Sequence, residues 1–182
     1  GWRVESIGPV LLAHWRRWGA PDYLQMDNDT RFAGSSRAVR RLGRLIRFCL
    51  AQGVVPVFAP PRETGFQAAV ESFNALWQAK VWQRFRHRDL DQLRTRNRAF
   101  LAAHHQLHAQ APALRRTAPW SPAETIVFLR RTDSRGRIWL LGACLTVAPH
   151  WPHRLVRAEL NVRTARVRIH ALRRRDPTRQ PL

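Results

Sequence analysis

Cysteine and long apolar runs are both scarce in this sequence of 182 residues. The two cysteines, Cys49 and Cys144, stand far apart and outside any C-x-x-C spacing, which excludes a disulfide framework and a zinc ribbon. No apolar run approaches the roughly 18 residues of a membrane span, and no charged-then-apolar signal segment opens the chain. We therefore expect a reduced, cytoplasmic protein without a membrane partner. The first residue is Gly1 rather than Met, which suggests a piece of a longer protein.

Acidic residues are also few. The chain has 12 of them against 32 lysines and arginines, a formal net charge of +20. This charge far exceeds what solubility requires and indicates a polyanionic partner such as nucleic acid. Lys80 is the only lysine, and the planar fork of arginine suits phosphate and guanine, although a GC-rich genome would favour arginine as well. The hydrophobic fraction of 45% is typical of a folded protein.

Residues 1–110 alternate between helical and strand patterns. Their periodicity predicts helices at 9–18, 35–53, 64–85 and 90–110, and strands at 23–26 and 54–61. Such alternation favours an α/β layer. Pro56 favours a sheet edge for the second strand. Two strands alone make a poor sheet, so we expect the missing strands upstream of Gly1.

A proline-rich linker at 111–122 precedes a change of pattern. The stretches "TIVFLRR", "RIWLLGACLTVAP" and "RLVRAELNVRTARVRIHAL" are strand-like and are separated by turn signals. They predict a small all-β domain at 123–182, an SH3-like barrel with a basic tail. Arginines that alternate with apolar residues would line one face, either as a nucleic-acid surface or as a solvated polar edge. The candidate DNA-binding residues are Lys80, Arg157, Arg163, Arg166, Arg168, Arg173, Arg174 and Arg175.

Two carboxylates stand out as candidate metal ligands. Asp27 directly follows a predicted strand, where open α/β sheets present ligand groups, and Glu71 lies on a helix that can pack beside that strand end. Together they could hold Mg²⁺, which prefers oxygen ligands. An Asx-turn cap is the alternative explanation for Asp27. His104 and His108 could ligate zinc at their i, i+4 spacing, but a basic helix often carries surface histidines.

The stretches "YLQMDNDTRF" and "PPRETGFQAAVESFNALWQ" resemble the Asp-Asn strand end and the Glu-bearing helix of the integrase catalytic core in insertion-sequence transposases and retroviral integrases. The stretch "APHWPHRLVRAEL" resembles the C-terminal tail of the integrase-like transposases. The resemblance implies a partial RNase H-like core and a triad of two aspartates and one glutamate. Asp27 matches the second aspartate and Glu71 the glutamate, with Asn28 and Asn74 as supporting residues. Mg²⁺ or Mn²⁺ would bind weakly, because the first aspartate has no counterpart.

The match to this family is incomplete in two further respects. The spacing between Asp27 and Glu71 is longer than the commonest one, and Gln78 stands where many relatives carry a basic residue. The resemblance implies a truncated DDE-type transposase or integrase, a polynucleotidyl transferase that binds transposon ends and target DNA and forms a homo-oligomer when full length. With two of three ligands, we expect this fragment to be inactive. The alternatives are a non-catalytic DNA-binding remnant or regulator of transposition, and a basic RNA-binding protein.

Overall fold

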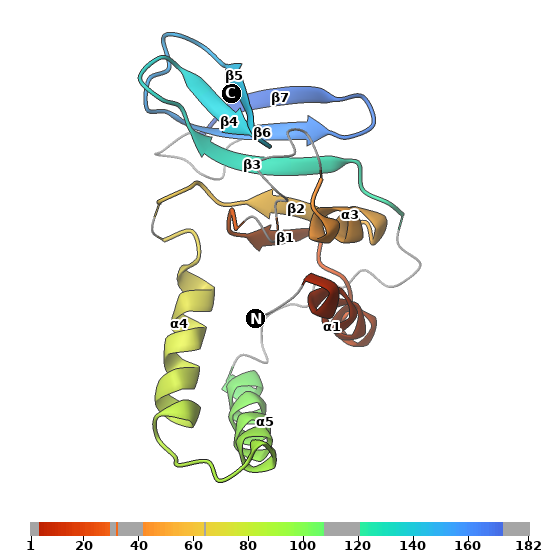
Figure 1. The fold of residues 1–182 in the computed structure, drawn as a ribbon, viewed down its shortest axis with the longest axis vertical. Coiled ribbons are helices and arrows are strands. Elements are labelled where there is room, and N and C mark those ends of the chain that lie inside the picture. Colours follow the sequence, from red (N-terminus) through yellow and green to blue (C-terminus); the bar gives the residue numbers. More distant parts are fainter. Residues whose placement is uncertain (1–3, 30–31, 33–41, 64, 108–120, 173–182) are drawn as a thin grey trace. The chain divides into compact units, whose positions relative to one another are not determined.

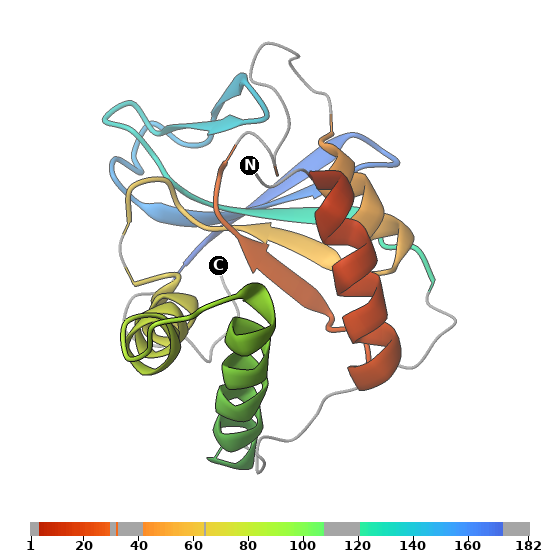
Figure 2. The ribbon, with the colours of Figure 1, turned by 60° about the horizontal axis from the view of Figure 1, so that its bottom comes forward.

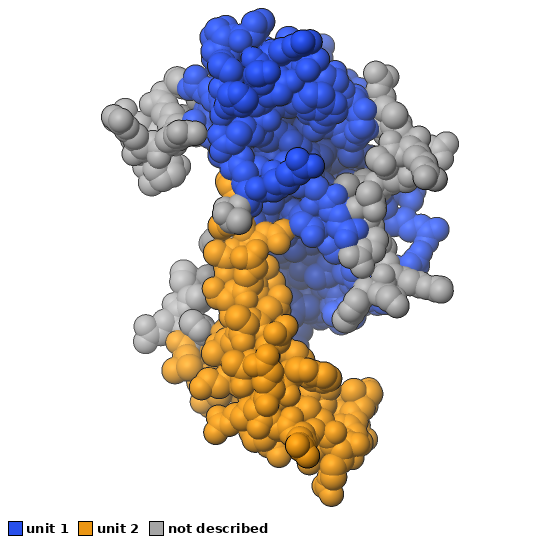
Figure 3. Space-filling view, turned by 60° about the vertical axis from the view of Figure 1, so that its left-hand side comes forward, with its two compact units in different colours: residues 1–63, 114–182 blue, residues 64–113 orange. Residues whose placement is uncertain are grey.

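The structure is a computed structural model that describes residues 4–29, 32, 42–63, 65–107 and 121–172 (Figure 1). The described elements form two compact units, unit 1 (residues 1–63 and 114–182) and unit 2 (residues 64–113) (Figure 3). In chain order the elements are α1 (Val4–Trp18), β1 (Tyr23–Met26), α3 (Arg44–Ala51), β2 (Val55–Phe58), α4 (Ala68–Trp77), the π-helix η1 (Gln78–Trp82), α5 (Leu90–Leu107), β3 (Thr125–Arg131), β4 (Arg137–Leu140), β5 (Ala143–Thr146), β6 (Leu155–Asn161) and β7 (Arg166–Ala171).

Unit 1 is built on a mixed five-stranded sheet with the strand order β1-β2-β3-β6-β7 (Figure 2). β1, β2 and β3 run parallel, whereas β6 and β7 are antiparallel to their neighbours. β4 and β5 form a separate two-stranded hairpin. The predicted α/β class is therefore confirmed, and the parallel pairing brings the carboxyl ends of β1 and β2 to the same edge of the sheet.

The core of unit 1 lies on one face of this sheet. Met26, Phe58 and Phe128 are in register across β1, β2 and β3 and are all buried, and the two phenylalanine rings stack at 5.2 Å. Helices α1 and α3 pack on this face, where the ring of Trp15 stacks on that of Phe48 at 5.6 Å. The β4–β5 hairpin adds buried residues to the same cluster. One apolar cluster thus joins segments from both ends of the chain.

The sequence predicted a closed SH3-like barrel at 123–182, and this prediction is wrong for the strands that the structure describes. β3 instead pairs in parallel with β2, at Val57↔Val127 and Phe58↔Phe128. Ile126, Val127 and Phe128 are buried at successive positions, so both faces of β3 are covered. Such a strand suits the middle of a mixed sheet, whereas a small barrel requires inward and outward residues to alternate.

Two other details of the sheet differ from the sequence predictions. β2 lies between β1 and β3 rather than at an edge, but its pairing with β3 begins only at Val57, one residue after Pro56, which has no N–H to donate. The strands expected upstream are not required for a sheet, because β3, β6 and β7 extend it. Unit 1 therefore joins residues on both sides of the predicted linker, most of which lies outside the described residues.

The turn between β3 and β4 is held by Asp133. Its carboxylate accepts hydrogen bonds from the backbone N–H groups of Arg135 and Arg137, at 2.8 and 2.9 Å, and forms an ion pair with the Arg137 guanidinium at 2.8 Å. These contacts, led by the backbone N–H of Arg137, lower the pKa of Asp133. Gly136 adopts a φ of 67°, and a Cβ there would lie 1.9 Å from the Ala148 carbonyl oxygen, so the turn requires glycine.

Unit 2 is a helical hairpin in which α4 continues into η1 and α5 returns. The Phe73 and Phe100 rings meet at 5.9 Å, Trp77 Nε1 donates to Asn97 Oδ1 at 2.7 Å, and Val81 is buried. Both helices were predicted from periodicity. Asp89 caps the start of α5, because its Oδ1 accepts from the backbone N–H of Gln92 at 2.7 Å. None of the described helices combines the length and apolar character needed to cross a membrane.

Candidate functional site

Asp27 lies at the carboxyl end of β1, directly after the buried Met26, and its side chain is exposed. Its Oδ1 accepts a hydrogen bond from the backbone N–H of Asp29 at 3.1 Å. This is the Asx turn that the sequence left open as an alternative. The turn occupies one oxygen of the Asp27 carboxylate. Asp27 forms no ion pair with any of the described residues. The geometry is compatible with a structural role and leaves room for a ligand role.

Asn28 connects the acidic turn to the rest of the sheet. Its Nδ2 donates to the carbonyl oxygen of Ala59, just beyond β2, at 2.5 Å. Its Oδ1 accepts from Arg130 Nη2 of β3 at 2.7 Å. The Asn28 amide thus ties the ends of β1 and β2 to the third strand. Residues 28, 59 and 130 and their hydrogen bonds are called the amide hub below.

Arg130 is the residue of this site that sequence reasoning missed. It is only 8% exposed, and its guanidinium donates to the carbonyl oxygens of Ala59, Leu129 and Trp139 at 3.2, 2.8 and 3.1 Å, as well as to Asn28. Burial lowers its pKa to about 10, which still leaves the side chain charged at neutral pH. The available signal was a cation that follows four apolar residues in "TIVFLRR". Arg130 thus places a buried positive charge in contact with Asn28, the residue that directly follows Asp27.

The neighbouring Arg131 has a different environment. Its Nε and Nη2 form a bidentate ion pair with the Glu63 carboxylate at 2.6 and 2.8 Å, and the Glu63 contact raises the pKa of Arg131. Glu63 is one of the few carboxylates in the α/β region. Since both of its oxygens bind Arg131, it is not available at the acidic turn.

Glu71 and Asn74 lie on α4 in unit 2, one turn apart and both exposed. Asp27 belongs to unit 1, so a joint role of the two carboxylates stays a prediction. Within the described parts of the chain, no group of three or more His, Cys, Asp or Glu could hold a metal ion. His104 packs edge-on against the Phe73 ring at 5.1 Å, and His108, the second residue of the zinc alternative, lies outside the described residues.

The predicted DNA-binding arginines fall into three groups. Arg157 and Arg163 form ion pairs with Glu159 and Glu124, at 2.7 and 3.0 Å. Arg166 and Arg168 are exposed on β7 and have no ion pair among the described residues. Arg173, Arg174 and Arg175 lie outside the described part of the chain, and Lys80 is exposed on η1 in unit 2. Of the predicted DNA-binding residues that the structure describes in unit 1, Arg166 and Arg168 are therefore the two that no carboxylate neutralises.

No known family model matches this chain, and no curated protein shows significant similarity to it. The resemblance to integrase-like transposases therefore depends on the quoted motifs alone. The structural features that bear on it are the position of Asp27 at a parallel strand end, the hydrogen bonds of Asn28 and the exposed cations of β7.

Proposed function

We propose that this chain is part of a DDE-type transposase or integrase with a partial RNase H-like core, which binds DNA and contributes Asp27 and Glu71 as metal ligands. The observation that carries the proposal is the exposed Asp27 carboxylate at the carboxyl end of β1, beside a parallel neighbour, where α/β folds present their ligands. The net charge of +20 supports transposon ends and target DNA as partners. The complete protein would act as a homo-oligomer.

The two carboxylates fit Mg²⁺ or Mn²⁺ in kind, because both ions prefer oxygen ligands. They do not fit in number, since the described residues contain no group of three or more His, Cys, Asp or Glu that could hold a metal ion. We therefore expect weak metal binding. Bound ions would activate a water molecule or a DNA 3′-hydroxyl and stabilise the leaving oxygen. The hydrogen bond from the Asp29 N–H restricts rotation of the Asp27 carboxylate. The amide hub fixes the backbone of the acidic turn, because Asn28 is bonded to Ala59 and Arg130.

A second candidate function is non-catalytic DNA binding, for example by a regulator of transposition. It is favoured by the lack of a complete metal-ligand group among the described residues, together with the unpaired cations of β7. The two functions share their DNA partner and differ only in the chemistry. An activity assay on two forms of the protein separates them.

We expect the 182-residue chain to give no joining product, and we expect metal-dependent joining after N-terminal extension by a strand that carries the first aspartate of the family pattern. The extension would supply the third carboxylate. The measurement is the joining of a labelled transposon end, taken from the element that encodes the protein, to plasmid DNA with and without Mg²⁺ or Mn²⁺. Efficient joining by the shorter chain would contradict the assignment of the site. An inactive extended protein that still binds DNA would favour the non-catalytic function.

The cations of β7 make a separate prediction. The double variant Arg166→Gln/Arg168→Gln should bind duplex DNA more weakly, by a similar factor for unrelated sequences. It is made in the complete chain, because β3 shares its core with β1 and β2. The slope of log affinity against log salt should shrink by roughly 2, as expected for two lost phosphate contacts. The control is Arg44→Gln/Arg94→Gln, which removes the same charge from arginines already paired with Glu5 and Asp91. An equal loss in both variants would mean that net charge alone drives binding.

A further inference from the structure

Unit 2 carries a second concentration of positive charge that the proposed function does not use. Residues 82–88, "WQRFRHR", connect η1 to α5 and are called the hairpin tip here. Arg84, Arg86 and Arg88 are all exposed, and none of them forms an ion pair among the described residues. The next arginine along the chain, Arg94, does have such a partner, Asp91, at 2.9 Å. The charge of the hairpin tip is therefore available to a partner.

The backbone of the hairpin tip is anchored at both ends. At the η1 end, the Val81 carbonyl oxygen lies 3.1 Å from His87 Nε2, and the His87 ring stacks on Trp82 at 6.0 Å. At the α5 end, the backbone N–H of Arg88 donates to Gln92 Oε1 at 3.0 Å. Anchored cations lose less conformational entropy on binding than cations on a loose loop. This arrangement favours a binding surface over a connector that is merely solvated.

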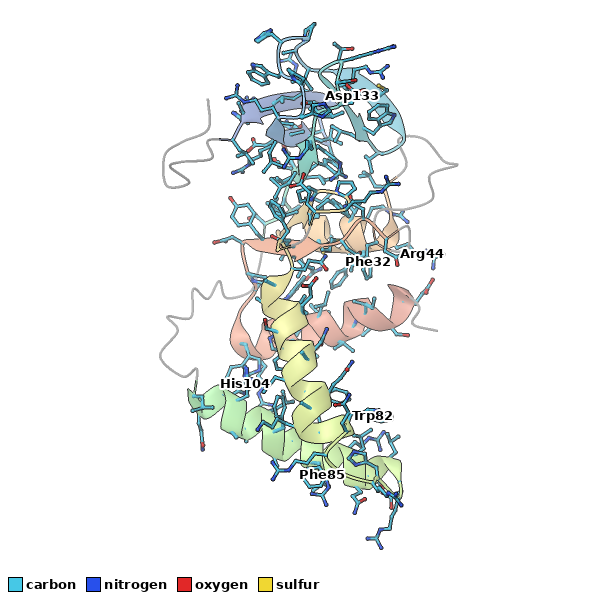
Figure 4. The ribbon with its side chains drawn as sticks, turned by 90° about the vertical axis from the view of Figure 1, so that its left-hand side faces the viewer. Phe32, Arg44, Trp82, Phe85, His104 and Asp133 are labelled. Atoms are coloured by element: carbon cyan, nitrogen blue, oxygen red, sulfur yellow. The ribbon has the colours of Figure 1, made fainter. Side chains whose placement is uncertain are left out.

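Aromatic rings lie among these arginines. Trp82 is 55% exposed, and the Phe85 ring carries the Arg96 guanidinium 3.7 Å from its centroid. Figure 4 shows Trp82 and Phe85 toward the same end of the two helices, whereas His104 lies toward the other end. Guanidinium groups that bind phosphates, next to an exposed planar ring, are typical of nucleic-acid surfaces. An acidic protein could also meet the charge, but a net charge of +20 distributed over both units suits a long, regular row of phosphates better.

We propose that the hairpin tip is a second DNA-contacting surface, distinct from the β7 arginines, and that Arg86 and Arg88 bind the phosphate backbone of duplex DNA there. The inference rests on the DNA-binding part of the proposed function and is independent of Asp27 and Glu71. Phosphate contacts carry no sequence information, so this surface acts on any duplex. Arg84 lies 5.5 Å from the Phe85 ring centroid and belongs partly to the packing of the hairpin tip.

The test uses the complete chain and three charge-matched double variants. Arg86→Gln/Arg88→Gln changes the hairpin tip, Arg166→Gln/Arg168→Gln changes β7, and Arg44→Gln/Arg94→Gln is the control with carboxylate-paired arginines. Binding is measured by fluorescence anisotropy on a labelled random-sequence duplex over a range of salt, with circular dichroism and thermal unfolding to confirm the fold. The hairpin-tip variant should bind at least ~10-fold more weakly near physiological salt, and its salt slope should shrink by about 2. The control should change affinity far less.

The results separate this inference from the proposed function. A hairpin-tip variant that binds like the control would overturn the inference, even when the β7 variant is impaired. A weakened hairpin-tip variant beside an unaffected β7 variant would support the inference and remove the β7 surface from the proposed function. Selective loss of single-stranded RNA binding, measured in parallel with an oligonucleotide of equal length, would reject duplex DNA as the partner. Should the double variant misfold, Arg86→Gln alone is expected to reduce the salt slope by about 1.

Discussion

Strand joining by the N-terminally extended protein is expected to fall at least ~1000-fold when Asp27→Asn or Glu71→Gln is introduced. Asparagine keeps the oxygen that accepts from the Asp29 N–H, so this substitution removes the charge while preserving the turn. Glu71 is exposed on α4, and glutamine there should leave the helix intact. A divalent ion bound through few carboxylates depends strongly on each of them. The measurement is the initial rate of transposon-end joining at saturating Mg²⁺ and at saturating Mn²⁺.

Matched carboxylate variants act as controls for this prediction. Asp29→Asn removes a charge two residues from Asp27, and Asp91→Asn removes one from the other helix of the hairpin that contains Glu71. Both should retain joining within a few-fold. DNA binding should stay the same or tighten slightly in all four variants, because each one loses a negative charge. Full activity in Asp27→Asn or Glu71→Gln would remove that residue from the site, and a loss in the controls would point to a different ligand.

Loss of the buried cation should produce the largest effect on stability. Arg130→Met is expected to lower the free energy of unfolding by about 3–5 kcal/mol. The substitution removes the Arg130 donor from the carbonyl oxygens of Leu129 and Trp139 and from the Oδ1 of Asn28. The Ala59 carbonyl oxygen loses one of its two donors and keeps Asn28 Nδ2. Methionine fills much of the space, so the loss reports on hydrogen bonding more than on a cavity. Urea unfolding monitored by circular dichroism gives the free energy.

The adjacent Arg131 offers a control for this change. Arg131→Met breaks a peripheral ion pair with Glu63, which should cost only about 1 kcal/mol. A double-mutant cycle between Asn28→Ala and Arg130→Met should yield a coupling energy of roughly 1–3 kcal/mol, because the two side chains bond directly. Equal losses for Arg130→Met and Arg131→Met would show that the amide hub contributes nothing specific to the stability of unit 1.

The sequence predicted the secondary-structure elements much better than their partners. It located β1, β2 and the two helices of unit 2, because their apolar spacing and caps are local signals. It began α1 too late, at residue 9 instead of Val4; the observed helix contains Pro9 in its interior, where proline is unfavourable and local rules do not expect it. The barrel prediction failed because strand patterns do not specify a partner strand, and β3 pairs with β2 across a long stretch of chain.

The candidate site shows the same division. Asp27 could be selected from sequence because a turn after a short strand is a local pattern, whereas Asn28 was selected through the family resemblance alone. The role of Arg130 could not be selected, because its partners Asn28 and Ala59 are 102 and 71 residues away. A buried arginine and an exposed one look alike in a basic sequence. Only burial in the sheet distinguishes Arg130 from Arg131, which forms its ion pair with Glu63 at the surface.

By itself, the sequence determined the net charge of +20, the α/β alternation and the order in which most elements follow one another. These properties are sums over residues or patterns within a few turns, so they require no knowledge of the fold. Only the tertiary structure decided that β3, β6 and β7 extend the sheet of β1 and β2, and that the amide hub supports the acidic turn. Strand pairing and the hydrogen bonding of buried polar groups depend on contacts between distant residues, which folding alone brings together.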